Sequence, residues 1–374
     1  MTRIYLDYNA TTPVDATVAQ AMRAAIEDSY GNPSSAHWAG ASAKRLLDRS
    51  RHQVAALLGC SPQEIVFTAG GSEANNLALK GVYFAQGNRA AHIITSAVEH
   101  PAVIEPCRFL ERLGARVTYL PVDARGRINP ADLERAITPA TILISVMHAN
   151  NEVGTIQPIE ECARIARSRG VPFHTDAAQS IGKIRTRVNE LGVDLFSVVG
   201  HKIYAPKGVG ALYVRSAINL EPLIHGGGHE SGRRAGTESA MLATGLGAAC
   251  ALAEDLSWTR HARELRDYMW TVLRERLGDR IVLNGHADYR LPNTLNVSVL
   301  GRAGADVLAA LDGVAASTGS ACHSGQVELS PVLRAMGIRE TDGMGAIRFS
   351  LGRGTTREEV SITVDRMTEI VRQP

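Results

Sequence analysis

A regular alternation of short β-rich runs and helical patterns fills the chain from about residue 64 to 215. Between residues 90 and 200 most runs lie about 15 to 25 residues apart, the spacing of strand–helix–strand crossovers. Such crossovers cover both faces of a sheet with helices, so the strands should be apolar throughout. The alternation predicts an α/β fold with a mostly parallel, seven-stranded sheet, built from EIVFTA, AHIITSA, ARVTYLPV, TILISVMH, VPFHTDA, DLFSVVG and GALYV.

The regular alternation of strand-like and helical runs ends at about residue 255. A long helical stretch from 238 to about 277 leads out of the first region, and shorter strand-like and helix-like runs follow, which predict a smaller α+β domain. A length of 374 residues also exceeds one compact unit of usual size. We expect a large domain at residues 15–255 and a small domain at residues 1–14 and 256–374.

Composition excludes several classes of protein. Forty basic and thirty-eight acidic residues give a net charge of +2 without long runs of either sign, which leaves no footprint for nucleic acid or an anionic membrane. The start, MTRIYLDYNATTPVD, lacks the apolar core of a signal peptide, and no later run is long enough to span a bilayer, so we expect a cytoplasmic protein. Five cysteines without a CxxC pair indicate neither a disulfide framework nor a zinc knuckle.

The segment EIVFTAGGSEANNLALKG runs from a strand through Gly70, Gly71 and Ser72 into a helix. Glycines let the backbone approach a ligand closely, and a helix N-terminus offers unpaired N–H groups at the positive end of its dipole. The turn is therefore a candidate phosphate site, with an ordinary strand-to-helix turn capped by Ser72 as the alternative. It is not a dinucleotide fingerprint, because GxGxxG is absent.

Two charged residues follow later strands. Asp176, in VPFHTDAAQS, comes at the end of an apolar strand, where a carboxylate of an α/β sheet faces the ligand crevice or caps a helix. Lys202, in SVVGHKIYAPKG, follows the next strand, where partial desolvation would free its amine to form a Schiff base. Lys207 and Lys183 are rival lysines. A phosphate cradle, a buried carboxylate and such a lysine agree on pyridoxal phosphate.

Two further residues are candidates for contact with cofactor or substrate. His100, in SAVEHPAV, precedes a helix that starts at Pro101, and its imidazole could lie over a cofactor ring and carry protons, or simply cap the helix. Arg348, in GAIRFSLG, lies inside an apolar strand and needs an anion, which is either a substrate carboxylate or a structural partner. The histidine spacing gives no metal site, since the pair His225 and His229 lacks a third ligand.

The stretch ASTGSACHSGQ surrounds one thiol, Cys322, with small and polar residues. The other four cysteines lie mostly in helical patterns. Glycine and serine on both sides of Cys322 permit motion, so we expect a poorly ordered loop. We also expect Gly319 and Gly325 to matter more for group transfer by the thiol than for cofactor binding.

With these residues identified, the chain resembles the cysteine desulfurases of the fold-type I pyridoxal-phosphate enzymes, in the class V aminotransferase group and of the long-loop type. The likeness covers almost the whole length and rests on ten motifs in order. They are YLDYNATTPVD, YGNPSSAH, FTAGGSEANNLALKG, VEHPAV, ANNEVGTIQP, HTDAAQS, GHKIYAPKGVGALYV, HGGGHESGRRAGT, STGSACHSG and IRFSLGRGTT.

The resemblance implies a role for each matching position. Lys202 would form the Schiff base with the cofactor aldehyde, Asp176 would pair with the pyridinium nitrogen, and His100 would stack on the ring and shuttle protons. Cys322 would be the nucleophile that takes sulfur from L-cysteine as a persulfide, leaving L-alanine. The remaining implied contacts are Gln179 to the phenolic oxygen, Gly71, Ser72 and His201 to the phosphate, Thr237 to the phosphate of a second subunit in a homodimer, and Asn151 and Arg348 to the substrate carboxylate.

Two departures from the family pattern leave alternatives open. Val199 stands where many desulfurases of this type have a phosphate-binding serine, and together with ACHSG it also resembles selenocysteine lyases. The sequence stops soon after the final helix, without the longer tail by which housekeeping desulfurases dock an iron–sulfur scaffold. The sulfur acceptor and the pathway therefore stay open among iron–sulfur cluster biogenesis, tRNA thiolation, DNA phosphorothioation and cofactor synthesis. Another pyridoxal-phosphate-dependent C–S lyase is a further alternative.

Overall fold

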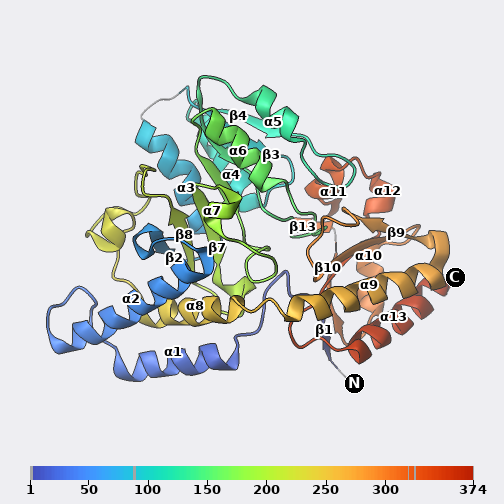
Figure 1. The fold of residues 1–374 in the computed structure, drawn as a ribbon. Coiled ribbons are helices and arrows are strands. Elements are labelled where there is room, and N and C mark those ends of the chain that lie inside the picture. The colour runs from blue at the N-terminus through green and yellow to red at the C-terminus, as the bar shows by residue number, and fades with distance from the viewer. Residues whose placement is uncertain (1–2, 87–89, 319, 324–325, 374) are drawn as a thin grey trace.

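A seven-stranded sheet forms the centre of the larger half of the protein in the computed structural model (Figure 1). The strand order is β2-β8-β7-β6-β5-β3-β4, and only the two pairings of β8 are antiparallel. The predicted α/β class and all seven strands are thereby confirmed. Their bounds are β2 Ile65–Thr68, β3 His92–Ser96, β4 Arg116–Leu120, β5 Thr141–Ser145, β6 Phe173–Asp176, β7 Leu195–Val199 and β8 Gly210–Val214.

Helices cover both faces of this sheet because its central strands are apolar on both sides. Ile93 packs with α3 and α4 on one face, whereas its neighbour Ile94 packs with α2, α6, α7 and α8 on the other. The helices of this half are α1 Ala16–Asp28, α2 Trp38–Leu58, α3 Gly71–Gln86, α4 Pro101–Arg112, α5 Pro130–Ala136, α6 Ile159–Ser168, α7 Val188–Leu191 and α8 Ala240–Ala253.

The smaller half contains a four-stranded sheet, β12-β15-β10-β9, with its own apolar core. Phe349 is fully buried there, and Ile4 and Leu6 join the same core from the N-terminal end of the chain. The elements are β1 Ile4–Tyr5, α9 Trp258–Leu277, β9 Ile281–Asn284, β10 Thr294–Val299, α10 Gly304–Ala310, β11 Val314–Ala315, β12 Ser317–Thr318, β13 Ser320–His323, β14 Gln326–Leu329, α11 Pro331–Ala335, α12 Glu340–Gly343, β15 Ala346–Ser350 and α13 Arg357–Arg372.

The long helix expected from 238 to about 277 is wrong in one respect, because it is two helices, α8 and α9. The Asp255 side chain accepts a hydrogen bond from the backbone N–H of Ser257 at 2.8 Å, a local turn that competes with the helix. Residue 255 stays our proposed domain boundary.

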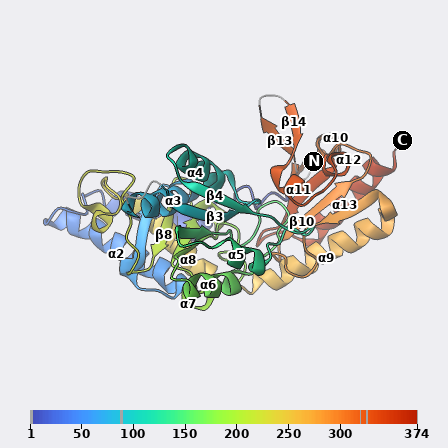
Figure 2. The same cartoon turned by 90° about the horizontal axis from the view of Figure 1, so that it is seen from above.

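The structure describes residues 3–86, 90–318, 320–323 and 326–373, and it describes 320–323 and 326–327 by their backbone alone. The expected soft loop around Cys322 is, in this described part, the antiparallel hairpin β13–β14, with Cys322 opposite Val327. Figure 2 shows the hairpin projecting from the smaller half. Gly319 and Gly325 lie outside the described residues. Across the described ranges, no helix is both long and apolar enough to cross a membrane.

Candidate active site

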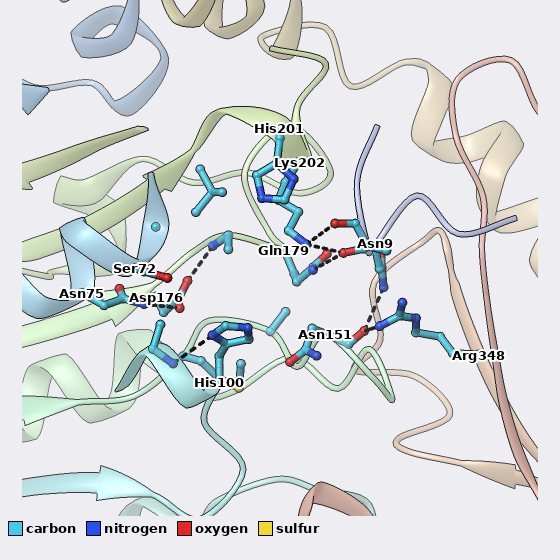
Figure 3. Close-up of a pocket in the computed structure, with 17 residues that line it drawn as sticks. Asn9, Ser72, Asn75, His100, Asn151, Asp176, Gln179, His201, Lys202 and Arg348 are labelled. Carbon is cyan, nitrogen blue, oxygen red and sulfur yellow. Dashed lines mark hydrogen bonds between the residues drawn. The ribbon is translucent and has the colours of Figure 1, made fainter. Parts of the chain in front are cut away.

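A cavity of about 320 Å³ lies at the carboxyl ends of β2, β3, β5, β6 and β7, where it also meets β15 of the smaller half (Figure 3). Carboxyl ends of parallel strands are the usual ligand sites of open α/β sheets. The structure brings nine of the candidate residues together in its wall. They are Gly71, Ser72, His100, Asn151, Asp176, Gln179, His201, Lys202 and Arg348.

Asp176 ends β6 with its side chain buried in the cavity wall. One carboxylate oxygen accepts a hydrogen bond from Asn75 Nδ2 at 2.6 Å, and the other accepts from the backbone N–H of Ala178 at 2.9 Å. On β6 behind it, the His174 ring is hydrogen-bonded to Ser145 and Ser197, and burial lowers its pKa to about 4. Asp176 is therefore held in one orientation by neutral partners, with its carboxylate in the cavity wall.

Lys202 follows β7 on a short 3₁₀ turn, Gly200–Lys202. Its Nζ donates to the carbonyl oxygens of Asn9 at 2.6 Å and Ala10 at 2.7 Å. Burial, together with the charge of Arg348, lowers the pKa of Lys202 to about 8, against the opposing effect of Asp176 and Asp7. A substantial neutral fraction near physiological pH makes this amine a competent nucleophile.

The two rival lysines do not line this cavity. Lys207 is exposed in the turn before β8. Lys183 is buried, and its Nζ donates to Asn9 Oδ1 at 3.1 Å and to Gln179 Oε1 at 2.8 Å. Lys183 therefore supports a cavity residue from behind, and Lys202 is the lysine that can reach a ligand.

The N-terminus of α3 forms part of the cavity wall, through Gly71 and Ser72. Gly70, at φ +147°, turns the chain from β2 into the helix, which begins at Gly71. A Cβ on Gly71 would lie 2.5 Å from a methyl group of Val199, so only glycine fits beside this valine. The turn can hold an anion on its backbone N–H groups, and His201 lines the same cavity.

His100 combines helix capping with a position in the cavity wall. Its Nδ1 accepts the backbone N–H of Ala102 at 3.0 Å, which makes it the N-cap of α4 and leaves the proton of the neutral ring on Nε2. Desolvation lowers the pKa of His100, Lys202 lowers it further, and Asp176 acts in the opposite direction. The capping alternative is therefore true, and it fixes a tautomer whose Nε2 remains available to a ligand.

Arg348, on β15, has a structural partner and still lines the cavity. Its Nη2 forms an ion pair with Asp7 at 2.7 Å, and its Nη1 donates to the carbonyl oxygen of Asn151 at 3.0 Å. Among the described residues, its Nε is buried without a hydrogen-bond partner. The salt bridge expected as an alternative is thus present, with one donor left over for a further anion.

Asn9 is a cavity residue that the sequence analysis missed. Its carbonyl oxygen accepts from Lys202 and from Gln179 Nε2 at 2.9 Å, and its Nδ2 donates to Asn151 and to Thr294. Asn9 lies in YLDYNATTPVD, the first motif of the family resemblance. The resemblance implied no functional role for any residue of this motif. A polar residue just after a short apolar strand was the only local signal.

Glu99 is the second missed residue. It is buried beside His100, and its Oε1 accepts from Ser96 Oγ at 2.6 Å and from the backbone N–H of Met147 at 2.8 Å. Its Oε2 has no partner in the described part of the chain. Burial raises the pKa of Glu99 to about 8, although its hydrogen bonds from Ser96 and Met147 act in the opposite direction. Glu99 therefore ties two segments of the cavity wall together as a neutral acid at physiological pH.

Two predicted site residues are not placed in this cavity. Thr237 is exposed and lines a separate hollow with Gly208 and Glu238. Cys322 lies on the β13 backbone, and its side chain is outside the described residues. Over the described ranges, no group of three or more His, Cys, Asp or Glu side chains is arranged to hold a metal ion.

Comparison with known proteins identifies close relatives over nearly the whole chain. A family model described as aminotransferase class-V matches residues 4–362. A "Cysteine desulfurase IscS" of Dictyoglomus turgidum is 47% identical over 99% of this chain and 95% of its own length. The human "Cysteine desulfurase" is 45% identical over 99% of this chain and 82% of its own length.

Solved structures give the same likeness in three dimensions. A "NIFS-LIKE PROTEIN" superposes with a TM-score of 0.93 at 39% identity and covers 99% of each chain. A structure described as "SspA in complex with cysteine" superposes with a TM-score of 0.85 at 40% identity, over 95% of this chain and 100% of that one. The fold and its arrangement of halves are therefore shared with these proteins.

Replacing Glu99 by glutamine tests whether this carboxyl is a neutral acid. In the unfolded chain the group ionises near 4.5, whereas in the native protein it keeps its proton up to about pH 8. Between these values the native state binds the extra proton, so the stability of the wild type falls as the pH rises. Glutamine does not titrate, and we expect Glu99→Gln to gain on the order of 1 kcal/mol per pH unit relative to wild type between about pH 5 and about pH 8.

Urea unfolding at several pH values measures this gain. Glu105→Gln, on the exposed side of α4, is the matched control for the same chemical change. A difference between Glu99→Gln and wild type that is constant with pH, or equal in the control, would contradict the assignment.

Proposed function

The chain belongs to the class V aminotransferase family and is a cysteine desulfurase, and from this premise we propose that it uses pyridoxal phosphate to move sulfur from L-cysteine onto Cys322. The observation that carries the proposal is one cavity that holds a desolvated lysine, a buried aspartate and a helix N-terminus. These are the groups that a phosphorylated pyridine aldehyde requires.

The residues in the cavity fit pyridoxal phosphate. Lys202 would hold its aldehyde carbon, Asp176 its ring nitrogen and Gln179 its phenolic oxygen, while Gly71, Ser72 and His201 would hold its phosphate. The charge on Asp176 and its neutral hydrogen-bond partners favour a protonated ring nitrogen. When bound, the cofactor supplies an electron sink for the pair released when the α-proton of an amino acid leaves.

Arg348 and Asn151 would bind the carboxylate of L-cysteine. The two Nη atoms of Arg348 are engaged by Asp7 and Asn151, and Nε is the donor that burial leaves without a partner in the described chain. An unpaired buried N–H is costly, so a carboxylate there gains both a charge pair and a hydrogen bond. This end of the cavity thus orients the substrate by its carboxylate, opposite the phosphate end.

His100 and Lys202 would move the protons. Lys202 Nζ in its neutral form can take the α-proton, since its pKa of about 8 lies near the working pH. The cap on Nδ1 fixes the His100 ring, so that Nε2 is the nitrogen that can give up and recover a proton. The low pKa of His100 keeps it neutral, as a proton shuttle near pH 7 requires.

Cys322 would complete the reaction as a nucleophile. Its thiolate attacks the sulfur of the substrate, an S–S bond forms, and the Cβ–S bond breaks with its electron pair staying on carbon. The carbon is reprotonated, so L-cysteine and the Cys322 thiol give L-alanine and a Cys322 persulfide. The sulfur is oxidised as the β-carbon is reduced, and no external oxidant is needed.

We extend the proposal to a homodimer in which Thr237 contacts the cofactor phosphate of the second subunit. Thr237 is exposed and outside the cavity of its own chain. An aromatic pair at the join of α1 and α2 supports a second copy, because Tyr30 and Trp38 are 76% and 78% exposed and stack edge to face. Exposed aromatic surface of this kind is typical of protein interfaces.

The persulfide would pass to an acceptor protein, and we propose a cytoplasmic role in iron–sulfur cluster biogenesis. The name IscS carried by the D. turgidum relative supports this pathway. The SspA structure is described as a complex with cysteine, which supports L-cysteine as the sulfur donor.

Incubation of the holoenzyme with L-cysteine tests the proposed reaction. We expect alanine and a mass increase of one sulfur atom on the peptide that contains Cys322, and loss of both sulfur transfer and the mass increase in Cys322→Ser. Lys202→Ala should lose the visible absorbance band of the bound cofactor, whereas Lys207→Ala should keep it. Alanine without sulfur on Cys322 would refute the nucleophile, and selenocysteine accepted with a much higher kcat/KM would favour a selenocysteine lyase.

Replacing Val199 by serine tests the phosphate end of the cavity. Serine would add a hydroxyl beside Gly71 and Ser72, and a hydrogen bond to a charged phosphate should lower the Kd for pyridoxal phosphate about tenfold. Val199→Ala removes the same methyl groups without adding a hydroxyl and is the control. Equal affinities of the serine and alanine variants in a titration of the apoenzyme would place the phosphate elsewhere.

Mixed dimers of Lys202→Ala and Thr237→Ala subunits test the contact between subunits. If Thr237 serves the second subunit, the mixed dimer contains one complete site and should recover about half of the wild-type activity at limiting cofactor, since one of two sites is intact. If Thr237 serves its own subunit, neither site is complete. Activity no higher than the average of the two parent variants would therefore contradict the proposal.

A further inference from the structure

Asp7 lies where the substrate end of the cavity meets the segment that leads to Cys322. Its Oδ1 accepts from Arg348 Nη2 at 2.7 Å and from Ser317 Oγ at 2.9 Å. Arg348 Nη2 also donates to Ser317 Oγ, at 3.0 Å. The three side chains form a closed ring of hydrogen bonds, which we call the Asp7 triad.

The N-terminal segment gives Asp7 a fixed position. The Tyr5 hydroxyl donates to the backbone oxygens of Asp7 and Thr11, at 3.1 and 2.9 Å, and β1 pairs with β11. Asp7 also forms an isolated bridge to Ser350 of β15, two residues beyond Arg348. The carboxylate is therefore anchored by backbone on both sides and can act as a rigid support for the guanidinium.

Arg348 is held by this support in one orientation. Asp7 and Ser317 take Nη2, and the carbonyl oxygen of Asn151 takes Nη1. Its side chain is only 10% exposed. The planar guanidinium has a fixed fork of donors, so anchoring two nitrogens determines where the third one points.

Ser317 connects this arginine to the nucleophile segment. It lies in β12, which pairs with β15 so that Ser317 is directly opposite Arg348. The hairpin β13–β14 starts three residues later, at Ser320, and carries Cys322. A change in the hydrogen bonds of Ser317 therefore acts on the strand immediately before the hairpin.

We propose that Asp7 and Ser317 are positioning residues that couple binding of the substrate carboxylate to the placement of the Cys322 hairpin. The inference rests on the proposed function of Arg348 and Cys322. A substrate carboxylate at Nε of Arg348 adds a second anion beside a guanidinium that Asp7 already pairs with, and so weakens the hold of Asp7 and Ser317 on Nη2. Ser317 is the member of the triad that lies on the strand leading to β13, and it transmits this change to the hairpin.

Hydrogen exchange of the holoenzyme tests the coupling without turnover. The probe is L-alanine, which has the carboxylate and the amine but no sulfur. We expect saturating L-alanine to change the exchange of backbone amides in 317–329 at least about twofold in the wild type, and to leave them unchanged in Ser317→Ala. Ser298→Ala removes a buried hydroxyl from the same sheet that accepts its hydrogen bond from Asn284 and not from the Asp7 triad, and this variant should respond like the wild type.

Kinetics separates the two roles. Asp7→Asn removes the support of Arg348 and should raise KM for L-cysteine about tenfold, the cost of weakening one charged contact. Ser317→Ala should keep KM within about twofold of the wild-type value but slow persulfide formation on Cys322 about five- to tenfold, and Ser317→Thr should restore that rate. Threonine keeps the hydroxyl but adds a methyl group. A general packing defect at position 317 would therefore not be relieved by Ser317→Thr, and the rate of persulfide formation would stay low.

The coupling is overturned if Ser317→Ala matches Ser298→Ala in both exchange and persulfide rate. It is also overturned if L-alanine binds to the wild type, as a spectral titration would report, without any change in 317–329. Failure of the proposed function has a different signature, because the wild type itself would then form no alanine or no persulfide from L-cysteine, whatever the exchange experiment gives.

Discussion

The hydrogen bonds of Asn9 hold the site together. Its carbonyl oxygen accepts a hydrogen bond from Lys202 Nζ, and its Oδ1 accepts one from Lys183 Nζ. Its Nδ2 donates to the carbonyl oxygen of Asn151 and to Thr294 Oγ1 of the smaller half. One buried side chain and one carbonyl therefore connect the lysine, the carboxylate-binding end and both sheets. Since every polar atom of a buried amide must be satisfied, displacing this turn would break several of these bonds at once.

Burial lowers the pKa of the lysine and the histidines that line the cavity, whereas the Asp176 and Asp7 carboxylates lie against hydrogen-bond donors. The pKa of Lys202 is lowered to about 8 and that of His201 to about 4, in both cases mainly by desolvation. Asp176 instead has two hydrogen-bond donors, and Asp7 has an arginine. Desolvation lowers the pKa of Lys202 even though the carbonyl oxygens of Asn9 and Ala10 accept from its Nζ. A lysine that titrates near the working pH is what acid–base work at a cofactor needs.

The sheet and most of the cavity could be predicted from the sequence because they depend on local patterns. Apolar runs specify the strands, and Asp176 and Lys202 follow them directly, so topology brings them to one edge. Asn9 and Asp7 could not be found this way, because their partners lie hundreds of residues away in sequence, as Ser350 and Arg348 do. The break between α8 and α9 was missed because one Asp side chain, that of Asp255, competes with the helix there.

The segment around Cys322 combines a defined register with little support. In the described residues β13 and β14 form a sheet of their own, and a two-stranded hairpin has marginal stability without a third strand or a packed helix. Small residues near Cys322 explain why the segment was expected to be soft, and the pairing of Cys322 with Val327 gives its backbone a defined register. A carrier that must collect sulfur at a buried cavity and release it elsewhere needs both properties. A two-stranded hairpin provides both, because within the described residues its strands pair with each other and with no further strand.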